Sequence, residues 1–287
     1  MAAYLQPGTL AEALDMLVQQ PLTILAGGTD VYPAMTGRAL WGRAEHADIL
    51  DISRLAGLRD IRREGADWRF GALASWTAVA AAALPAQFAG LQQAARQVGG
   101  VQIQNRGTLG GNICNASPAA DGVPPLLSLD ARVELRSNAG MRVLPLASFL
   151  DGYRHTVRRP DELVTAILVA DGPGLGSFQK LGARSYLVIS IAMVAAVLEI
   201  SPEGTILAAR IAVGSCSPVA MRLPGLERDL AGIPVRGAAQ RIDATHVAGL
   251  VPIDDVRASG AYRRHAVLVM LKDALRACAG RFERKAA

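Results

Sequence analysis

The segment from Arg106 to Ala131, RGTLGGNICNASPAADGVPPLLSLDA, constrains the fold of this chain more than any other. It gathers glycine, asparagine, serine and proline and then runs directly into an apolar stretch. A β-turn needs only about four residues, so a simple chain reversal does not explain this length. Glycine lets backbone N–H groups converge on one concave surface and removes side chains that would block an anion. The segment therefore predicts a ligand-binding surface.

The size of the chain indicates two domains, because 287 residues exceed what one hydrophobic core usually serves. Hydrophobic residues make up 51% and charged residues 19%, which is typical of a globular protein. No apolar run reaches the roughly 18 residues of a membrane span. The N-terminus also lacks the basic and apolar regions of a signal peptide. We expect a cytoplasmic protein without a membrane span.

The net charge of +5 does not by itself indicate a nucleic-acid partner. The basic residues are scattered, and aromatic residues, which would stack on bases, make up only 5%. The expected role of the charge is a mildly basic, solvated surface, with a face for an acidic partner as the alternative.

The cysteines predict neither a disulfide framework nor a metal site in this chain. There are three, without a CxxC pair: Cys114, Cys216 and Cys278. An odd count in an apparently cytosolic chain argues against disulfides, and zinc or iron–sulfur sites need closely spaced ligands. Each cysteine is expected to be a small buried apolar residue, with a reactive thiol as the alternative.

The N-terminal segment predicts a helix followed by a βαβ-like unit. Thr9 and Glu12 have the capping-box spacing, and a helical apolar stripe follows at Leu10, Ala13, Leu14 and Leu17. Residues 22–26 predict a strand, the glycines of GGTD a turn, and the next residues a short helix. A second strand is expected over residues 48–53.

The middle of the chain predicts a mixture of helices and antiparallel strands. Residues 68–82 indicate a strand running into a helix, capped by Ser75 or Thr77, and residues 89–98 a further helix. Residues 131–146 predict a hairpin that turns at residues 138–140. A loop and then a strand are expected over residues 151–169.

The character of the chain changes after residue 170. Residues 170–177, ADGPGLGS, predict a linker, so we place a domain boundary near 170–178. Residues 186–200 predict a buried strand, and residues 190–215 predict a long hairpin that turns at Glu203-Gly204. Two helical stretches are expected to finish the chain, the last over residues 262–280. The predicted domains are 1–174, with subdomains of about 1–54 and 55–174, and 178–287.

Two glycine segments of similar type predict a phosphate site. One is Ala26 to Asp30, after a strand, and the other is Thr108 to Asn112. Two converging loops suit a pyrophosphate, and Thr29, Thr108 and Asn112 add hydrogen-bond donors. Neither segment is a P-loop, because no Gly-Lys-Ser/Thr follows, and neither has the GxGxxG spacing. The alternative for each is a tight turn.

Asp121 has two interpretations that the sequence leaves open. A carboxylate is unfavourable against phosphate but accepts hydrogen bonds from a ribose or ribityl hydroxyl. Alternatively, Asp121 caps a helix ahead of VPPLLSLDA.

The sequence contains no local acid–base motif. The four histidines, His46, His155, His246 and His265, lie outside HExxH and triad contexts, and His155 is expected on the surface. No GxSxG elbow is present. This pattern favours chemistry carried by a bound cofactor.

The chain resembles the FAD-binding subunit of the molybdenum hydroxylases, the family of xanthine dehydrogenase and carbon monoxide dehydrogenase. The resemblance rests on ILAGGTDVYP and GTLGGNICNASPAAD, and it continues in GYRHTVRRPDELV and FQKLGARSYLVISIAMVA. The C-terminal region, down to YRRHAVLVML, is also similar to the family's small C-terminal domain. The resemblance thus covers the chain nearly end to end.

The resemblance implies an α+β fold. The expected architecture is the FAD-binding domain of the vanillyl-alcohol oxidase (PCMH) type, with two subdomains holding the dinucleotide between them, followed by a small C-terminal α+β domain. It also implies a set of FAD-contacting positions, with Val164 on the adenine, Lys180 near the flavin, and valine at Val98, where xanthine dehydrogenases place an aromatic ring. Arg184 matches a family arginine to which we assign no role. The implied cofactor-binding residues are Ile24, Leu25, Ala26, Gly27, Gly28, Thr29, Asp30, Val31, Val98, Thr108, Leu109, Gly110, Gly111, Asn112, Asp121, Val164 and Lys180, with no metal ligand.

The implied function is electron transfer within a complex. In the family, electrons leave a molybdopterin site in a large subunit, pass two [2Fe-2S] clusters in a small subunit, and reach FAD in this subunit, which reduces NAD or another acceptor. The expected assembly is a dimer of heterotrimers, and the segment RSYLVISIA leans towards xanthine dehydrogenase. Two alternatives are a stand-alone flavin oxidase or reductase of the same superfamily and a non-catalytic nucleotide-binding module.

Overall fold

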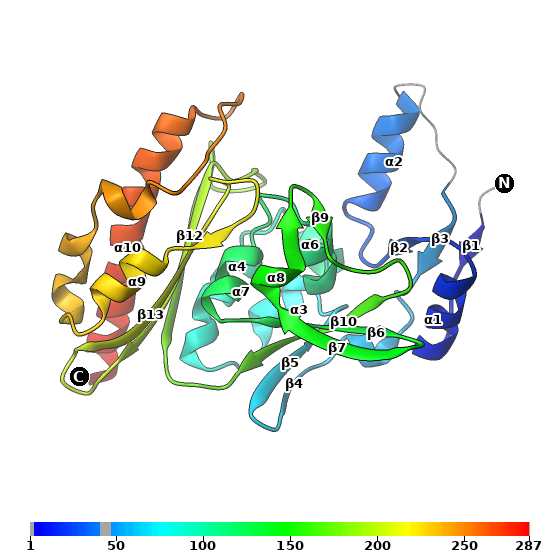
Figure 1. The fold of residues 1–287 in the computed structure, drawn as a ribbon, viewed down its shortest axis with the longest axis horizontal. Coiled ribbons are helices and arrows are strands. Elements are labelled where there is room, and N and C mark those ends of the chain that lie inside the picture. The colour runs from blue at the N-terminus through cyan, green and yellow to red at the C-terminus, as the bar shows by residue number, and fades with distance from the viewer. Residues whose placement is uncertain (1–2, 41–46, 287) are drawn as a thin grey trace.

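The computed structural model describes residues 3–40 and 47–286 of the chain (Figure 1). His46, one of the four histidines considered in the sequence analysis, lies outside the described residues. Three units follow one another along the molecule, with the N-terminal unit at one end and the C-terminal unit at the other (Figure 1). In the part of the chain that is described, no helix is both long and apolar enough to cross a membrane.

The N-terminal unit is a small parallel sheet with two helices. Its strands β1 (Tyr4–Leu5), β3 (Ile49–Asp51) and β2 (Thr23–Leu25) lie in that order, and β3 pairs in parallel with both neighbours. Helix α1 (Leu10–Gln19) begins with the predicted capping box, in which Thr9 accepts from the Glu12 amide and Glu12 accepts in return. Its buried residues Ala13, Leu14 and Leu17 confirm the predicted apolar stripe.

Helix α2 (Val31–Leu40) confirms the short helix predicted after the first glycine segment. It follows β2 through the turn at residues 26–30 and projects away from the body of the molecule (Figure 1). The chain then returns through β3, so the predicted βαβ-like unit is confirmed.

The central unit is built on a five-stranded antiparallel sheet. The strands are β4 (Ile61–Glu64), β5 (Asp67–Gly71), β10 (Leu163–Ala170), β6 (Arg132–Ser137) and β7 (Gly140–Pro145), in that order across the sheet. The β6–β7 hairpin is confirmed, with Ser137 paired to Gly140 across the turn. A short pair, β8 (Leu150–Gly152) and β9 (His155–Thr156), follows helix α8 (Leu146–Phe149).

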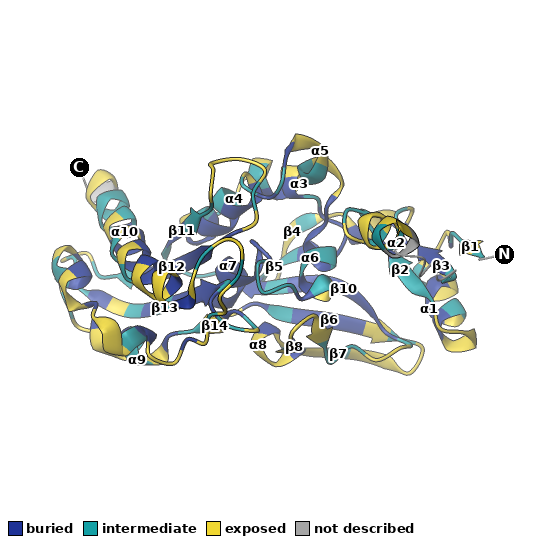
Figure 2. Cartoon of the chain, turned by 90° about the horizontal axis from the view of Figure 1, so that it is seen from above, coloured by how far each residue is buried: buried dark blue, intermediate teal, exposed yellow. Residues whose placement is uncertain are grey.

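Five short helices complete the central unit. They are α3 (Trp76–Ala81), α4 (Ala89–Ala95), α5 (Val101–Arg106), α6 (Leu109–Asn115) and α7 (Val123–Ser128). Ser75 caps α3 by accepting from the Ala78 amide, as one of the two predicted alternatives, whereas Thr77 instead donates to Asn105. Apolar residues of α3, α4, α6 and α7 form one buried core with the sheet, and the burial pattern is visible in Figure 2.

Two predictions for this region were wrong. The helix expected over residues 89–98 ends at Ala95, where the Gln97 amide donates to the Ala94 carbonyl in a tighter turn. The chain then reverses at Gly99, with a left-handed φ of 51°, and a separate helix, α5, follows. The glycine segment at Thr108 is the beginning of helix α6 and not a loop. Tertiary contacts override the low helix propensity of its two glycines.

The C-terminal unit is a four-stranded antiparallel sheet covered by helices. Its strands are β11 (Leu175–Leu181), β12 (Ala192–Ile200), β13 (Ile206–Gly214) and β14 (Met221–Arg222). The long β12–β13 hairpin is confirmed, and Gly204 supplies the positive φ of 86° at its turn. Helix α9 (Pro224–Leu230) and the 27-residue helix α10 (Gly260–Ala286) confirm the helical end of the chain.

Two boundaries differ from the predicted ones. Strand β12 begins at Ala192, while Tyr186, Leu187 and Ile189 are exposed on the connection that precedes it. Pairing of Leu181 with Ala192 closes the β11–β12 hairpin, so the residues between them have no strand partner and apolar character alone did not make them a strand. The predicted linker is also shorter, because Gly176 and Ser177 already belong to β11.

Close backbone packing fixes the C-terminal unit on the central unit. A side chain at Gly176 would lie 2.2 Å from the Gln87 carbonyl oxygen, and one at Gly90 would lie 2.7 Å from that of Ser177. The Phe178 amide donates to the Gln93 side chain at 2.8 Å. The beginning of β11 therefore lies directly against α4 and the turn before it.

The central sheet contains a buried ion pair. Arg69 on β5 donates two hydrogen bonds, of 2.7 and 2.8 Å, to the carboxylate of Glu134 on β6, and Thr165 on β10 also donates to it. Burial alone would raise the pKa of Glu134, but these hydrogen bonds and the Arg69 charge lower it to about 2. The pair links the three middle strands.

We expect Glu134→Gln to destabilise the fold at neutral pH by about 3 kcal/mol, because it leaves the buried Arg69 without its anion. Since the folded-state pKa lies below the ordinary value of 4.5, the ionised Glu134 stabilises the fold above that pH. Its contribution is lost as the pH falls towards 2. Urea unfolding of the wild-type and variant proteins from pH 7 to pH 3 should show the difference shrinking.

The exposed Asp60, which forms a surface ion pair with Arg62, gives the control. Asp60→Asn should change stability by less than about 1 kcal/mol. A Glu134→Gln variant as stable as this control at pH 7 would contradict the assigned role.

Candidate functional site

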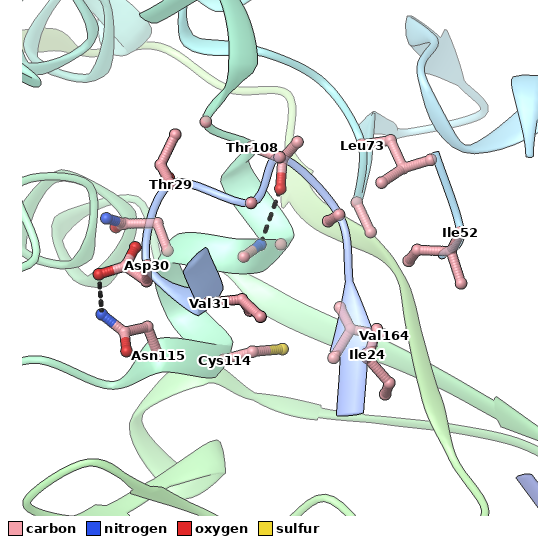
Figure 3. A pocket seen from close by; sticks show the side chains of 18 of the residues that line it. Ile24, Thr29, Asp30, Val31, Ile52, Leu73, Thr108, Cys114, Asn115 and Val164 are labelled. Carbon is pink, nitrogen blue, oxygen red and sulfur yellow. Dashed lines mark hydrogen bonds between the residues drawn. The ribbon is translucent and has the colours of Figure 1, made fainter. Parts of the chain in front are cut away.

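A cavity of about 440 Å³ lies between the N-terminal and central units. Its wall includes both glycine segments, residues 26–31 and 107–112, together with residues of β2, β10 and the connection before β10 (Figure 3). Cavities of this size and position, between two structural units, are typical ligand sites.

The first glycine segment joins β2 to α2. A side chain at Gly27 would lie 2.0 Å from the Arg106 carbonyl oxygen, so only glycine allows the turn to lie against the end of α5. Gly28 has a φ of 77°, which is strained for other residues. The amides of Gly27, Gly28, Thr29 and Asp30 donate to no acceptor in the described chain. They are available to an anion.

The second segment is the first turn of α6. Thr108 caps the helix by accepting from the Gly111 amide at 3.0 Å (Figure 3). A side chain at Gly110 would lie 2.7 Å from the Ala72 carbonyl oxygen, which explains glycine there. The amides of this first turn are already occupied, because Leu109 donates to the Ala74 carbonyl, Gly110 to the Ala72 carbonyl and Gly111 to Thr108. The segment therefore shapes the cavity wall without offering these three amides to a ligand.

Polar side chains join the two segments across the cavity wall. Asn115, at the end of α6, donates to the Asp30 carboxylate at 3.0 Å (Figure 3). Arg154 in turn donates to Asn115 at 3.1 Å. The buried Asn112 side-chain oxygen has no hydrogen-bond partner in the described chain. A buried polar atom without a partner is costly, which is consistent with a ligand site.

The remaining wall is mainly apolar. Ile24, Ile52, Leu163 and Val164 surround it, and Val98 lines the cavity at 9% exposure. Cys114 extends into the cavity and is accessible there, contrary to the burial expected from its type (Figure 3). The surrounding protein desolvates the thiol and raises its pKa to about 11, so it is not an activated nucleophile.

Thirteen of the seventeen predicted cofactor-binding residues line this cavity. They are Ile24, Ala26, Gly27, Gly28, Thr29, Asp30, Val31, Val98, Thr108, Gly110, Gly111, Asn112 and Val164. Leu25 and Leu109 lie beside them but are buried, at 4% and 0% exposure, because alternate positions of a strand and the inner face of a helix point into the core.

Asp121 and Lys180 lie outside the cavity wall and form a buried ion pair. Lys180 on β11 donates to Asp121 at 2.8 Å and to the Gln97 carbonyl at 3.0 Å. Ser190 donates to the other Asp121 oxygen at 2.7 Å. Burial raises the pKa of Asp121, and the Lys180 ammonium group and the Ser190 hydroxyl oppose that rise. The helix-capping alternative for Asp121 was wrong, because Gly122 occupies the N-cap of α7.

Several cavity residues were not predicted from the sequence. They are Ile52, Ala72, Leu73, Trp76, Ile103, Gly107, Cys114, Asn115, Arg158 and Leu163. The apolar ones carry no signal that separates a cavity wall from a core. Asn115 and Arg158 are polar residues in segments already singled out, so their positions could have been proposed.

The described histidines do not join the cavity wall. His155 is on the surface as predicted, with 71% of its side chain exposed and a hydrogen bond to Asp151. His246 is a helix-capping partner of Asp243.

Fold and cavity together define an α+β protein with a cavity between two of its units, and backbone amides without an acceptor in the described chain form part of the cavity wall. The comparisons identify the family. Residues 1–170 match the family described as "FAD binding domain in molybdopterin dehydrogenase", and residues 177–278 match "CO dehydrogenase flavoprotein C-terminal domain".

Individual relatives agree with these matches. The chain is 32% identical to the nicotinate dehydrogenase FAD-subunit of Eubacterium barkeri, over 81% of this chain and 80% of the relative. It is 30% identical to the xanthine dehydrogenase FAD-binding subunit of Escherichia coli O157:H7, over 94% of both chains. A carbon monoxide dehydrogenase structure from Hydrogenophaga pseudoflava, which lacks the Mo-pyranopterin moiety, superposes with a TM-score of 0.88 over 98% of both chains at 28% identity.

The chain belongs to the FAD-binding medium subunits of the xanthine and carbon monoxide dehydrogenase family of molybdenum hydroxylases. The resemblance read from the motifs is therefore confirmed, as are the α+β architecture, FAD as the cofactor and the oxidoreductase class.

We expect Gly27→Ala to weaken FAD binding by more than about tenfold, equivalent to about 1.4 kcal/mol. The new methyl group would meet the Arg106 backbone, which no side-chain rotation can relieve. Flavin fluorescence titration measures the affinity. Gly225→Ala in α9 is the matched control, because nothing lies within 4 Å of the added carbon. Equal affinities for both variants would exclude the packing role of Gly27.

We expect Lys180→Met to destabilise the fold by roughly 3 to 5 kcal/mol, because it leaves a buried carboxylate at Asp121 unpaired. The double variant Asp121→Asn with Lys180→Met should recover part of this loss. Denaturant unfolding of each variant measures the effect. Lys272→Met on α10 serves as the control. If Lys180→Met lowers the free energy of unfolding no more than Lys272→Met does, the ion pair does not stabilise the fold.

Proposed function

We propose that this chain transfers electrons through FAD from iron–sulfur clusters of a partner subunit to NAD or another acceptor, in a xanthine dehydrogenase-like complex. The observation that carries the proposal is the cavity between two units, whose wall includes the amides of residues 27–30, which have no acceptor in the described chain, and the beginning of α6. When bound, FAD supplies the redox chemistry, which requires no acid–base residue of the chain.

The cavity fits one half of such a dinucleotide. The amides of residues 27–30, which have no acceptor in the described chain, match a pyrophosphate, which needs several donors. The apolar wall at Ile24, Leu163 and Val164 matches a flat adenine ring. Asn112, whose side-chain oxygen is without a partner in the described chain, offers one more polar contact.

For Asp121 and Lys180 we propose an indirect part in holding the cofactor. Their ion pair fixes the turn after α6 to β11 and to the end of the segment that contains Val98. The pair would set the position of the wall that follows the second glycine segment. The two predicted domains, 1–174 and 178–287, remain our proposal for the division of the chain.

The partners are proposed from the relatives. Xanthine dehydrogenase FAD-binding subunits and the carbon monoxide dehydrogenase structure point to complexes that hold a molybdenum cofactor. We propose a small [2Fe-2S] subunit and a large molybdopterin-binding subunit, assembled as a dimer of heterotrimers. The exposed Tyr186, Leu187 and Ile189 are apolar surface that such partners could cover.

The test is gentle purification of the native protein, with an absorbance spectrum and identification of co-purifying chains. We expect flavin bands, iron–sulfur absorption and two further polypeptides. Adding the substrate that the complex oxidises should then lead to reduction of NAD. Electron transfer only to a quinone or to oxygen would instead identify that compound as the acceptor.

Other outcomes separate the alternatives. Flavin on a lone chain that oxidises a simple organic compound would favour the stand-alone oxidase or reductase. Adenine nucleotides bound as tightly as FAD, without flavin in the native protein, would favour the nucleotide-binding module.

A further inference from the structure

Arg158 is a cavity residue that neither the motifs nor the family resemblance assigns. It lies on the connection between β9 and β10, is half-buried, and lines the cavity with Leu163 and Val164. Its Nη1 donates to the carbonyl oxygens of Arg159 and Glu162, both at 2.8 Å. These bonds hold the guanidinium group at the wall by one edge.

The other edge of the guanidinium group is available. Nε and Nη2 of Arg158 donate to no described residue, and neither is buried without a partner. Guanidinium nitrogens are strong donors in a fixed plane, suited to phosphate oxygens and to ring nitrogens of a base. The backbone contacts therefore orient a donor edge before a ligand arrives.

Arg158 contributes positive charge to the cavity wall. Among the described residues of the wall, Arg158 is the one cation and Asp30 the one anion. Asp30 accepts a hydrogen bond from the Asn115 amide and forms no ion pair with Arg158 within the described chain. A dinucleotide brings a negative pyrophosphate into this space, where a guanidinium group is its natural charge partner.

The neighbours of Arg158 place it towards the apolar end of the cavity. Its charge acts on the Cys114 thiol, which lies one helical turn beyond Gly111 on α6. Leu163 and Val164 follow it on the same connection and strand. On the proposed placement of FAD, this part of the wall faces adenine and the adjoining phosphate.

We propose that Arg158 is a specificity-determining residue that binds the ADP half of the cofactor, so that the site selects FAD over FMN. This inference rests on the proposed placement of FAD in the cavity. Arg158 contributes affinity only for ligands that carry the ADP group, and the flavin half is held without it.

The test compares Arg158→Leu with the wild-type full chain, together with the subunits that co-purify, after removal of flavin. Titrations with FAD, FMN and ADP measure affinity. We expect about tenfold or greater loss for FAD and for ADP, as for a hydrogen bond from a charged group, and no change for FMN. Arg158→Lys, which keeps the charge but not the planar edge, should recover part of the loss.

Arg159→Leu is the matched control, because this neighbouring arginine is exposed and its backbone contacts do not depend on its side chain. It should leave all three affinities unchanged. Thermal unfolding of the flavin-free proteins adds a structural readout. Equal losses of affinity for FAD and FMN would overturn the proposal in favour of a role in holding the loop. A fall in the unfolding temperature of Arg158→Leu that explains the lost affinity would have the same consequence.

The result separates this inference from the proposed function. Wild-type protein that binds no FAD would refute the proposed function itself. If the wild-type protein binds FAD and the Arg158→Leu variant binds FAD and ADP as tightly as the wild type does, only the role of Arg158 is refuted.

Discussion

The structure depends on the direct backbone contact between the turn at Gly27 and the end of α5. A single added carbon at Gly27 would lie 2.0 Å from the Arg106 carbonyl oxygen, so the N-terminal unit can reach the central unit only where no side chain intervenes. The same principle applies at Gly110 against Ala72, which seats α6 on the central unit. Because these contacts position the turn without using its amides, the N–H groups of residues 27–30 have no acceptor among the described residues and are available to a ligand.

The C-terminal unit holds the turn after α6 in place, although none of its described residues lines the cavity. Its Lys180 and the neighbouring Ser190 hold Asp121, and the Ser215 amide donates to the Pro118 carbonyl, so the turn after α6 is tied to this unit at two points. Arg263 of α10 in turn donates to the Ile191 carbonyl beside Ser190. The helix that presents the second glycine segment is therefore held at its beginning by Ala72, and beyond its end by β11, by the connection before β12 and by the residue after β13. Displacement of the C-terminal unit would reach the cofactor site through this turn.

Local signals in the sequence predicted much of the fold. The capping box at Thr9, the cap at Ser75 and the hairpin turn at residues 138–139 depend on neighbouring residues and were found where expected. Long-range contacts decided the rest. The glycines at 110 and 111 indicated a loop, yet they lie in the first turn of a helix. Glycine is required at 110 because a side chain there would meet Ala72. The Asp121–Lys180 pair joins residues 59 positions apart, and no local pattern indicates such a partner.

The site also shows why motif residues and specificity residues differ. On the proposed placement of FAD, the first glycine segment supplies backbone amides, which suit any phosphate and carry no information about the rest of the ligand. Selection among ligands that share a flavin would then come from side chains of the wall. Arg158 is the one cation of the described wall, and its guanidinium group is fixed by carbonyl oxygens and not by an acidic side chain. A carboxylate partner would neutralise the charge that a pyrophosphate needs, whereas carbonyl oxygens orient the group and leave its charge to the ligand.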